Sequence, residues 1–114
     1  MKNYPLAANT WDDKEIKAIQ SVIDKGNYTM GDSVAQFEQD FAKFINRKHC
    51  VMVSSGSAAN LIATAALFYT KSPMLKKGDE VIVPAVSWST TYSPLQQYGL
   101  KLRFIDIDIS TLNY

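Results

Sequence analysis

The sequence predicts an α/β fold in which two helices precede a parallel βαβαβ sheet. Apolar residues first recur at helical spacing in two successive segments. Three short apolar runs then alternate with two further helical segments. Right-handed crossovers convert that order into a parallel sheet whose strands all finish at one edge.

The first predicted helix covers about residues 11–25. Thr10 and Asp13 resemble a capping box, apolar residues follow at helical spacing, and a glycine ends the pattern. A second helix follows a short polar loop and carries an apolar stripe rich in phenylalanine, which we expect to lie in the core. We expect Asp32 or Ser33 to cap this helix.

The three predicted strands are 51–53, 80–83 and 101–107. The run 51–53 has no polar alternate, which is typical of a strand covered on both faces. A serine-rich turn joins it to a long apolar helix over 58–69, and the second strand ends at a proline that cannot continue the ladder. A short helix over 88–98, closed by a glycine, leads to the third strand.

The composition of the chain limits the kind of partner. Its 114 residues suit one compact domain, and a formal net charge of +1 gives no field that would attract nucleic acid. No stretch has the apolar length of a signal peptide core or a membrane span. The single cysteine, Cys50, excludes an internal disulfide and fits a reducing cytosol. We expect a cytoplasmic protein that binds neither nucleic acid nor a membrane, with no metal site.

The first candidate ligand loop contains Gly56 and Ser57. In open α/β sheets, ligands bind beyond the carboxyl ends of the strands, where helix N-termini point backbone N–H groups outward. Gly56 permits a close backbone approach, and free N–H groups near Ser57 can hold a phosphate dianion. Taken alone, a small-residue turn between a strand and a helix is more often only a turn.

The second candidate loop carries Trp88 among small polar residues. Its indole can lie flat against a planar heterocycle, although a tryptophan near an α/β core more often serves packing. A phosphate turn after one strand and a stacking ring after the next together suit a flat phosphorylated cofactor such as pyridoxal phosphate. A dinucleotide would predict a Gly-x-Gly-x-x-Gly turn, whereas this turn has only Gly56.

At these residues the chain resembles the sugar-aminotransferase family, fold type I pyridoxal-phosphate proteins that act on nucleotide-activated sugars. The resemblance covers essentially the whole chain. The passages that carry it are 4–7, 10–13, 28–31, 51–57, 75–91 and 106–113.

The resemblance implies a role for each candidate residue. Gly56 and Ser57 would hold the cofactor phosphate, and Trp88 would stack on the pyridine ring. The cofactor would be pyridoxal 5'-phosphate or pyridoxamine 5'-phosphate, with L-glutamate as amino donor, and the protein would be a homodimer. A loop after the first helix would border the nucleotide-linked keto sugar, through Asn27, Tyr28, Thr29 and Met30.

Trp88 favours a dehydratase subgroup of this family, because ordinary sugar aminotransferases tend to have Phe or Tyr in the same loop. The resemblance then implies loss of the C3 hydroxyl from a nucleotide-linked 4-keto sugar, in the biosynthesis of deoxysugars for O-antigen lipopolysaccharide. The base would be a His in place of the aminotransferase Lys. Neither can be assigned here, since the family places it beyond Tyr114.

Two alternatives stay open: a nucleotide-sugar aminotransferase, and a non-catalytic truncated fragment. We expect residues 1–114 to be the N-terminal portion of a cofactor-binding large domain. Residues 1–31 would form its first helix and substrate-side loop, and residues 32–114 the start of its sheet. Alone, this portion is expected to be inactive.

Four other polar residues are assigned ordinary structural roles. His49 precedes a predicted strand at the end opposite the ligand loops, and Cys50 beside it is expected in the core. Asp106 and Asp108 lie near the carboxyl end of a strand, where paired carboxylates can bind a metal or move a proton. A strand-end turn with cap-forming carboxylates is the favoured interpretation.

Overall fold

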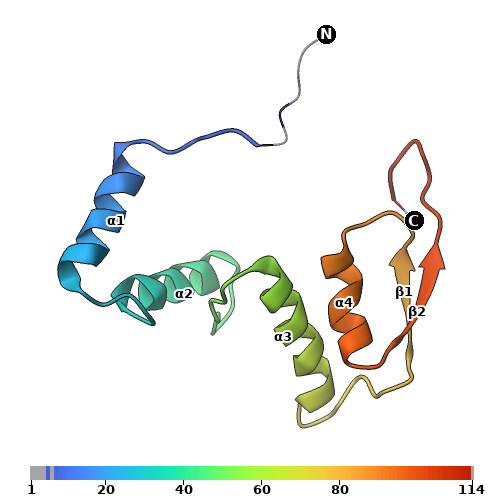
Figure 1. Cartoon of the computed structure of the whole chain (residues 1–114). Helices are drawn as coiled ribbons and strands as arrows, with labels where there is room; N and C mark the ends of the chain where they lie inside the picture. The colour runs from blue at the N-terminus through green and yellow to red at the C-terminus, as the bar shows by residue number, and fades with distance from the viewer. Residues whose placement is uncertain (1–4, 6, 114) are drawn as a thin grey trace. The chain divides into compact units, whose positions relative to one another are not determined.

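The computed structural model describes residue 5 and residues 7–113, so the passage at 4–7 lies partly outside the described residues. The chain divides into two compact units, Met1–Met52 and Val53–Tyr114, which are described separately (Figure 1). No helix in the described part of the chain is long and apolar enough to cross a membrane. The elements in chain order are α1 (Asp13–Lys25), α2 (Asp32–Phe44), α3 (Gly56–Tyr69), β1 (Glu80–Pro84), α4 (Ser89–Gln97) and β2 (Lys101–Ile105).

Helix α1 begins two residues later than its predicted start, and its cap is Asp12 rather than Thr10. The Asp12 carboxylate accepts a hydrogen bond from the Lys14 N–H at 2.6 Å, and Glu15 accepts one from the Asp12 N–H at 2.7 Å. This reciprocal pair satisfies two N–H groups that a helix start otherwise leaves unpaired. Glu15 has one methylene more than Asp13, so its carboxylate reaches back to the Asp12 N–H and completes the capping box there. The predicted capping box of Thr10 and Asp13 was therefore wrong.

Helix α2 is capped by Gly31, so the prediction of Asp32 or Ser33 as cap was wrong. Gly31 has an extended backbone, and its carbonyl accepts from the N–H groups of Val34 and Ala35 at 3.0 and 3.2 Å. Asp32 is already helical and has no capping bond, although its charge in the first turn suits the helix dipole.

The phenylalanine stripe of α2 forms, but it is not buried within the first unit. Phe37 and Phe41 stack with ring centroids 5.7 Å apart, yet they remain 48% and 43% exposed, and Phe44 is 84% exposed. Only Ala42 of this helix is buried. In the described part of the chain, the pairs of elements that pack extensively all belong to the second unit. The stripe therefore has no closely packed helix or strand over it within the first unit.

The predicted first strand, 51–53, does not form. A strand requires a neighbour for its backbone groups, and β1 and β2 pair only with each other. The Met52 N–H instead donates to a carboxylate oxygen of Glu38 at 2.7 Å. Val51 is 70% exposed, which is the opposite of a strand covered on both faces.

The second unit is a parallel βαβ crossover with one helix before it. Strands β1 and β2 pair in parallel from Glu80 opposite Lys101 to Pro84 opposite Ile105, and α4 connects them. Helix α3 packs on α4, and α4 packs on β2 (Figure 1). The α/β fold is therefore confirmed, with two strands in the described sheet. Its small core contains Val83, Thr64, Pro94 and Leu100.

Helix α4 ends at Gln97, one residue before its predicted end, and Gly99 follows the cap residue Tyr98 in the left-handed conformation. The φ of Gly99 is +73°, and its N–H donates to the Gln96 carbonyl at 2.9 Å. A Cβ added here would lie 2.8 Å from Cγ of Lys77, on the turn that precedes β1. Gly99 therefore satisfies both a backbone requirement and a close approach.

We predict that Gly99→Ala lowers the free energy of unfolding of the whole protein by about 1–3 kcal/mol, because alanine adds left-handed strain and a contact with Lys77. Gly26→Ala is the matched control, since Gly26 has a φ of +68° and open space around the added Cβ. Urea unfolding of both variants measures the difference. If Gly99→Ala lowers the free energy of unfolding no more than Gly26→Ala does, the contact of the added Cβ with Lys77 does not destabilise the protein.

Candidate functional site

The turn before α3 leaves two backbone donors available. Ser55 caps the helix: its Oγ accepts from the Ala58 N–H at 3.2 Å, and its carbonyl accepts from the Ala59 N–H at 3.0 Å. The N–H groups of Gly56 and Ser57, the first two helical residues, have no such acceptor. They lie at the positive end of the helix dipole, which favours an anion.

The space beside Gly56 is open. A Cβ added to this residue would meet no atom of the described chain within 4 Å, and its backbone does not have a positive φ. Packing therefore does not require glycine at this position. The absence of a side chain leaves the Gly56 and Ser57 N–H groups accessible to a ligand, and a phosphate group fits these donors.

The loop after β1 is fixed to the sheet at its start. The Ala85 N–H donates to the Ile105 carbonyl at 2.7 Å, which extends the parallel pairing by one bond. The Tyr92 hydroxyl donates to the Pro84 carbonyl at 2.6 Å. The Tyr92 ring packs edge-on against the Phe104 ring, with ring centroids 5.3 Å apart. These contacts define the path of the chain as it leaves the sheet.

Trp88 stands at the N-terminus of α4 with its side chain 78% exposed. Its carbonyl accepts from the Thr91 N–H at 2.9 Å, and the hydroxyls of Ser87 and Thr91 are hydrogen-bonded at 2.8 Å. The backbone of Trp88 is thus held while its indole remains uncovered within the unit. This is the arrangement required of a stacking ring, and it argues against a packing role within the described chain.

The structure brings the two candidate loops together. The side-chain amide of Asn60, one turn into α3, donates to the Thr90 carbonyl at 3.3 Å, across 30 positions of sequence. Ser57 and Thr90 also line the same cavity, of about 260 Å³, between α3 and α4. The sequence did not reveal this link. Pro94 is the residue that could have indicated it, because proline has no N–H to donate to the carbonyl of Thr90, four residues earlier in the helix.

The predicted substrate loop lies in the first unit. Asn27 and Tyr28 line a cavity of about 490 Å³ with the last turn of α1 and the first turn of α2, whereas Thr29 and Met30 do not. The Tyr28 hydroxyl donates to the Ile23 carbonyl at 3.3 Å, and its side chain is 69% exposed. Met30 is 92% exposed and has a φ of +47°.

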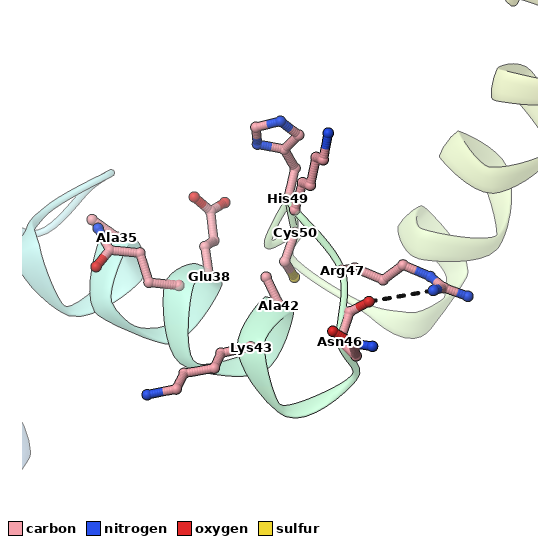
Figure 2. A pocket seen from close by; sticks show the side chains of 10 residues that line it. Ala35, Glu38, Ala42, Lys43, Asn46, Arg47, His49 and Cys50 are labelled. Atoms are coloured by element: carbon pink, nitrogen blue, oxygen red, sulfur yellow. Dashed lines mark hydrogen bonds between the residues drawn. The ribbon is translucent and has the colours of Figure 1, made fainter.

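A cavity of about 540 Å³ lies between α2 and the segment after it, and Figure 2 shows His49 and Cys50 among its lining residues. Cys50 is half-buried, so its expected place in the core was wrong: the absent strand at 51–53 leaves it beside a cavity. His49 is exposed. The described residues contain no group of three or more His, Cys, Asp or Glu side chains that could hold a metal.

The strand-end carboxylates form local turns, as the favoured interpretation predicted. Asp106 accepts from the Ile107 N–H at 2.8 Å, and Asp108 accepts from the N–H groups of Ser110 and Thr111 at 2.8 and 3.0 Å. Hydrogen bonds from the Ser110 hydroxyl, then from the Thr111 and Ser110 N–H groups, hold the pKa of the Asp108 carboxyl below its ordinary value. Asp108 is therefore a turn acceptor at neutral pH and not a proton donor.

The class of protein follows from the fold and its solved neighbours. Two crystal structures of GDP-4-keto-6-deoxymannose-3-dehydratase match the chain with TM-scores of 0.89 and 0.88 at 68% sequence identity. One contains a trapped PLP–glutamate geminal diamine, and the other is a mutant with bound GDP-perosamine. Each match covers 96% of this chain and 28% of the solved chain. The chain thus has part of the fold of pyridoxal-phosphate-dependent transferases.

The chain belongs to the DegT/DnrJ/EryC1/StrS aminotransferase family, which matches residues 9–114. GDP-4-keto-6-deoxy-D-mannose 3-dehydratase of Escherichia coli O55:H7 (strain CB9615 / EPEC) is 68% identical over 113 residues. That match covers 99% of this chain and 29% of the relative, so the chain spans less than a third of the relative's length. The family resemblance stated from the sequence motifs is confirmed.

We predict that an NMR titration of Asp108 gives a pKa below that of an ordinary carboxyl, and that Ser110→Ala raises it by removing the largest contribution. Because the pKa of Asp108 is lowered in the folded state, its ionised carboxylate contributes its full stabilisation at a pH above the ordinary carboxyl pKa. That stabilisation is lost as the pH falls through the pKa of the folded state. An Asp108 pKa unchanged by Ser110→Ala would contradict the assignment.

Proposed function

We propose that the whole protein to which this chain belongs is a pyridoxal-phosphate-dependent 3-dehydratase of GDP-4-keto-6-deoxy-D-mannose, in deoxysugar and O-antigen lipopolysaccharide biosynthesis. This chain supplies the phosphate-binding and ring-stacking part of its cofactor site. The proposal is supported by the 68% identity to enzymes of this activity and by the site at the N-termini of α3 and α4.

The observation that carries the site assignment is the pair of available N–H groups at Gly56 and Ser57. Both precede the first regular hydrogen bond of α3, and a Cβ added to Gly56 would meet no described atom within 4 Å. A phosphate dianion matches two convergent donors at the positive end of a 14-residue helix. The Ser57 hydroxyl adds a further donor beside them.

Trp88 provides the second contact with the cofactor. Its indole is 78% exposed in the loop that follows β1, and the Asn60–Thr90 hydrogen bond joins its helix to α3. A planar indole can stack on a pyridine ring and exclude water from one face. When bound, the cofactor supplies the electron-withdrawing ring on which this chemistry depends, while Gly56, Ser57 and Trp88 hold and orient it.

The GDP-sugar is assigned to the loop Asn27, Tyr28, Thr29 and Met30. Tyr28 has an exposed ring beside a cavity, and such a ring can pack on a sugar or a base. The relative with bound GDP-perosamine supports a GDP-linked ligand, and the PLP–glutamate complex supports L-glutamate as amino donor. We further propose that the whole protein is a cytoplasmic homodimer, as its family resemblance implies.

No catalytic base is assigned within this chain. The family resemblance places the base beyond Tyr114, and Asp108, held ionised by its turn, lacks the proton affinity that a base requires. His49 lines the α2 cavity of the first unit. A nucleotide-sugar aminotransferase is the alternative reaction on the same cofactor. The relatives described above are dehydratases, and this favours dehydration.

We predict that the whole protein, loaded with pyridoxamine 5'-phosphate, converts GDP-4-keto-6-deoxy-D-mannose to the 3-deoxy-4-keto sugar and releases ammonia. Mass spectrometry of the sugar and an ammonia assay distinguish the two reactions. An aminotransferase would instead yield the 4-amino sugar and retain the C3 hydroxyl. Formation of the amino sugar alone, or no turnover, would overturn the proposal.

We predict that Trp88→Ala weakens pyridoxal phosphate binding by the whole protein about ten-fold, because the stacking surface is lost. Trp88→Phe should recover part of the affinity. Trp11→Ala is the matched control, since Trp11 is also exposed but precedes α1 in the first unit and belongs to neither candidate cofactor loop. Equilibrium titration measures the affinities, and equal Kd values for Trp88→Ala and the unmodified protein would remove Trp88 from the site.

A further inference from the structure

Pro94 creates an unusual acceptor on α4. It is buried within the helix, and because proline has no N–H, the carbonyl four residues earlier loses its regular helical donor. That carbonyl belongs to Thr90, two residues after Trp88. An acceptor without its regular donor takes another partner where one is within reach.

Asn60 provides that partner. Its side-chain amide donates to the Thr90 carbonyl at 3.3 Å, and it comes from α3, four residues after Gly56. In the described part of the chain, this is the side-chain hydrogen bond that joins α3 to α4. Around it, residues from both helices line the cavity of about 260 Å³, including Ser57, Thr90 and Pro94.

We propose that Asn60 is a positioning residue for the cofactor site. By holding the Thr90 carbonyl that Pro94 leaves available, it sets the distance between the phosphate turn at Gly56 and the indole of Trp88. This inference rests on the proposed function, because it concerns where the cofactor ring is held. Asn60 itself is not proposed to touch the cofactor.

The division of anchoring points supports this role. The Tyr92 hydroxyl and the Ala85 N–H hold the start of the loop to the sheet, but neither reaches α3. Asn60 holds the first turn of α4, directly after the loop, to the helix that carries the phosphate donors. Trp88 lies between the two anchoring points and its indole is exposed, so its orientation depends on its backbone.

The test compares Asn60→Ala and the neutral, similarly sized Asn60→Leu with the unmodified whole protein. Gln97→Ala is the matched control, because Gln97 also carries an amide and lines the same cavity from α4, but its side chain makes no hydrogen bond in the described chain. Each variant is titrated with pyridoxal phosphate, alone and combined with Trp88→Ala. In whole protein whose other tryptophans are all replaced by phenylalanine, fluorescence anisotropy of Trp88 reports its mobility before cofactor is added.

Both Asn60 variants are expected to weaken binding about two- to ten-fold, as loss of one hydrogen bond implies, and to lower the Trp88 anisotropy. Gln97→Ala should change neither. In the Trp88→Ala background the Asn60 effect should vanish, because Asn60 acts through Trp88.

Unchanged affinity in both Asn60 variants would overturn the inference, and so would an equal loss with and without Trp88. The latter would assign Asn60 a general structural role. Failure of the proposed function is distinguishable: the unmodified protein would not bind pyridoxal phosphate, or Trp88→Ala would leave its Kd unchanged.

Discussion

The parallel pairing of β1 with β2 determines where the candidate site of the second unit lies. Because the strands run in the same direction, Pro84 and Ile105 end at one edge of the sheet. The α4 crossover must then begin at that edge, and α3, which packs on α4, begins beside it. The available N–H groups of Gly56 and Ser57 and the exposed indole of Trp88 are brought together by this topology, rather than by proximity in sequence.

Features encoded within a few residues were predicted well from the sequence. The start of a helix beside Gly56, the left-handed Gly99 after α4 and the position of Trp88 before a helix depend on local backbone chemistry, and the structure contains all three. Helix caps were less accurate. Several polar residues compete at each helix start, and the length of the Glu15 side chain decided between Thr10 and Asp12.

Features that depend on distant partners could not be predicted in this way. The apolar run 51–53 has the composition of a strand, but pairing requires a neighbouring strand, and the Met52 N–H bonds to Glu38 instead. The hydrogen bond between Asn60 and Thr90 joins residues 30 positions apart, so no local pattern encodes it. Pro94 was its visible sign: a proline inside a short helix marks a carbonyl that takes a partner from elsewhere.

The central claim is that the Gly56 and Ser57 N–H groups bind the cofactor phosphate. Amide NMR of the ¹⁵N-labelled whole protein tests it most directly, by comparing pyridoxal phosphate with pyridoxal, which lacks the phosphate. The account predicts large downfield shifts of the Gly56 and Ser57 amide protons with pyridoxal phosphate and little change with pyridoxal, since only the phosphate accepts their hydrogen bonds. Amide shifts that are the same for both ligands, or absent for both, would contradict it.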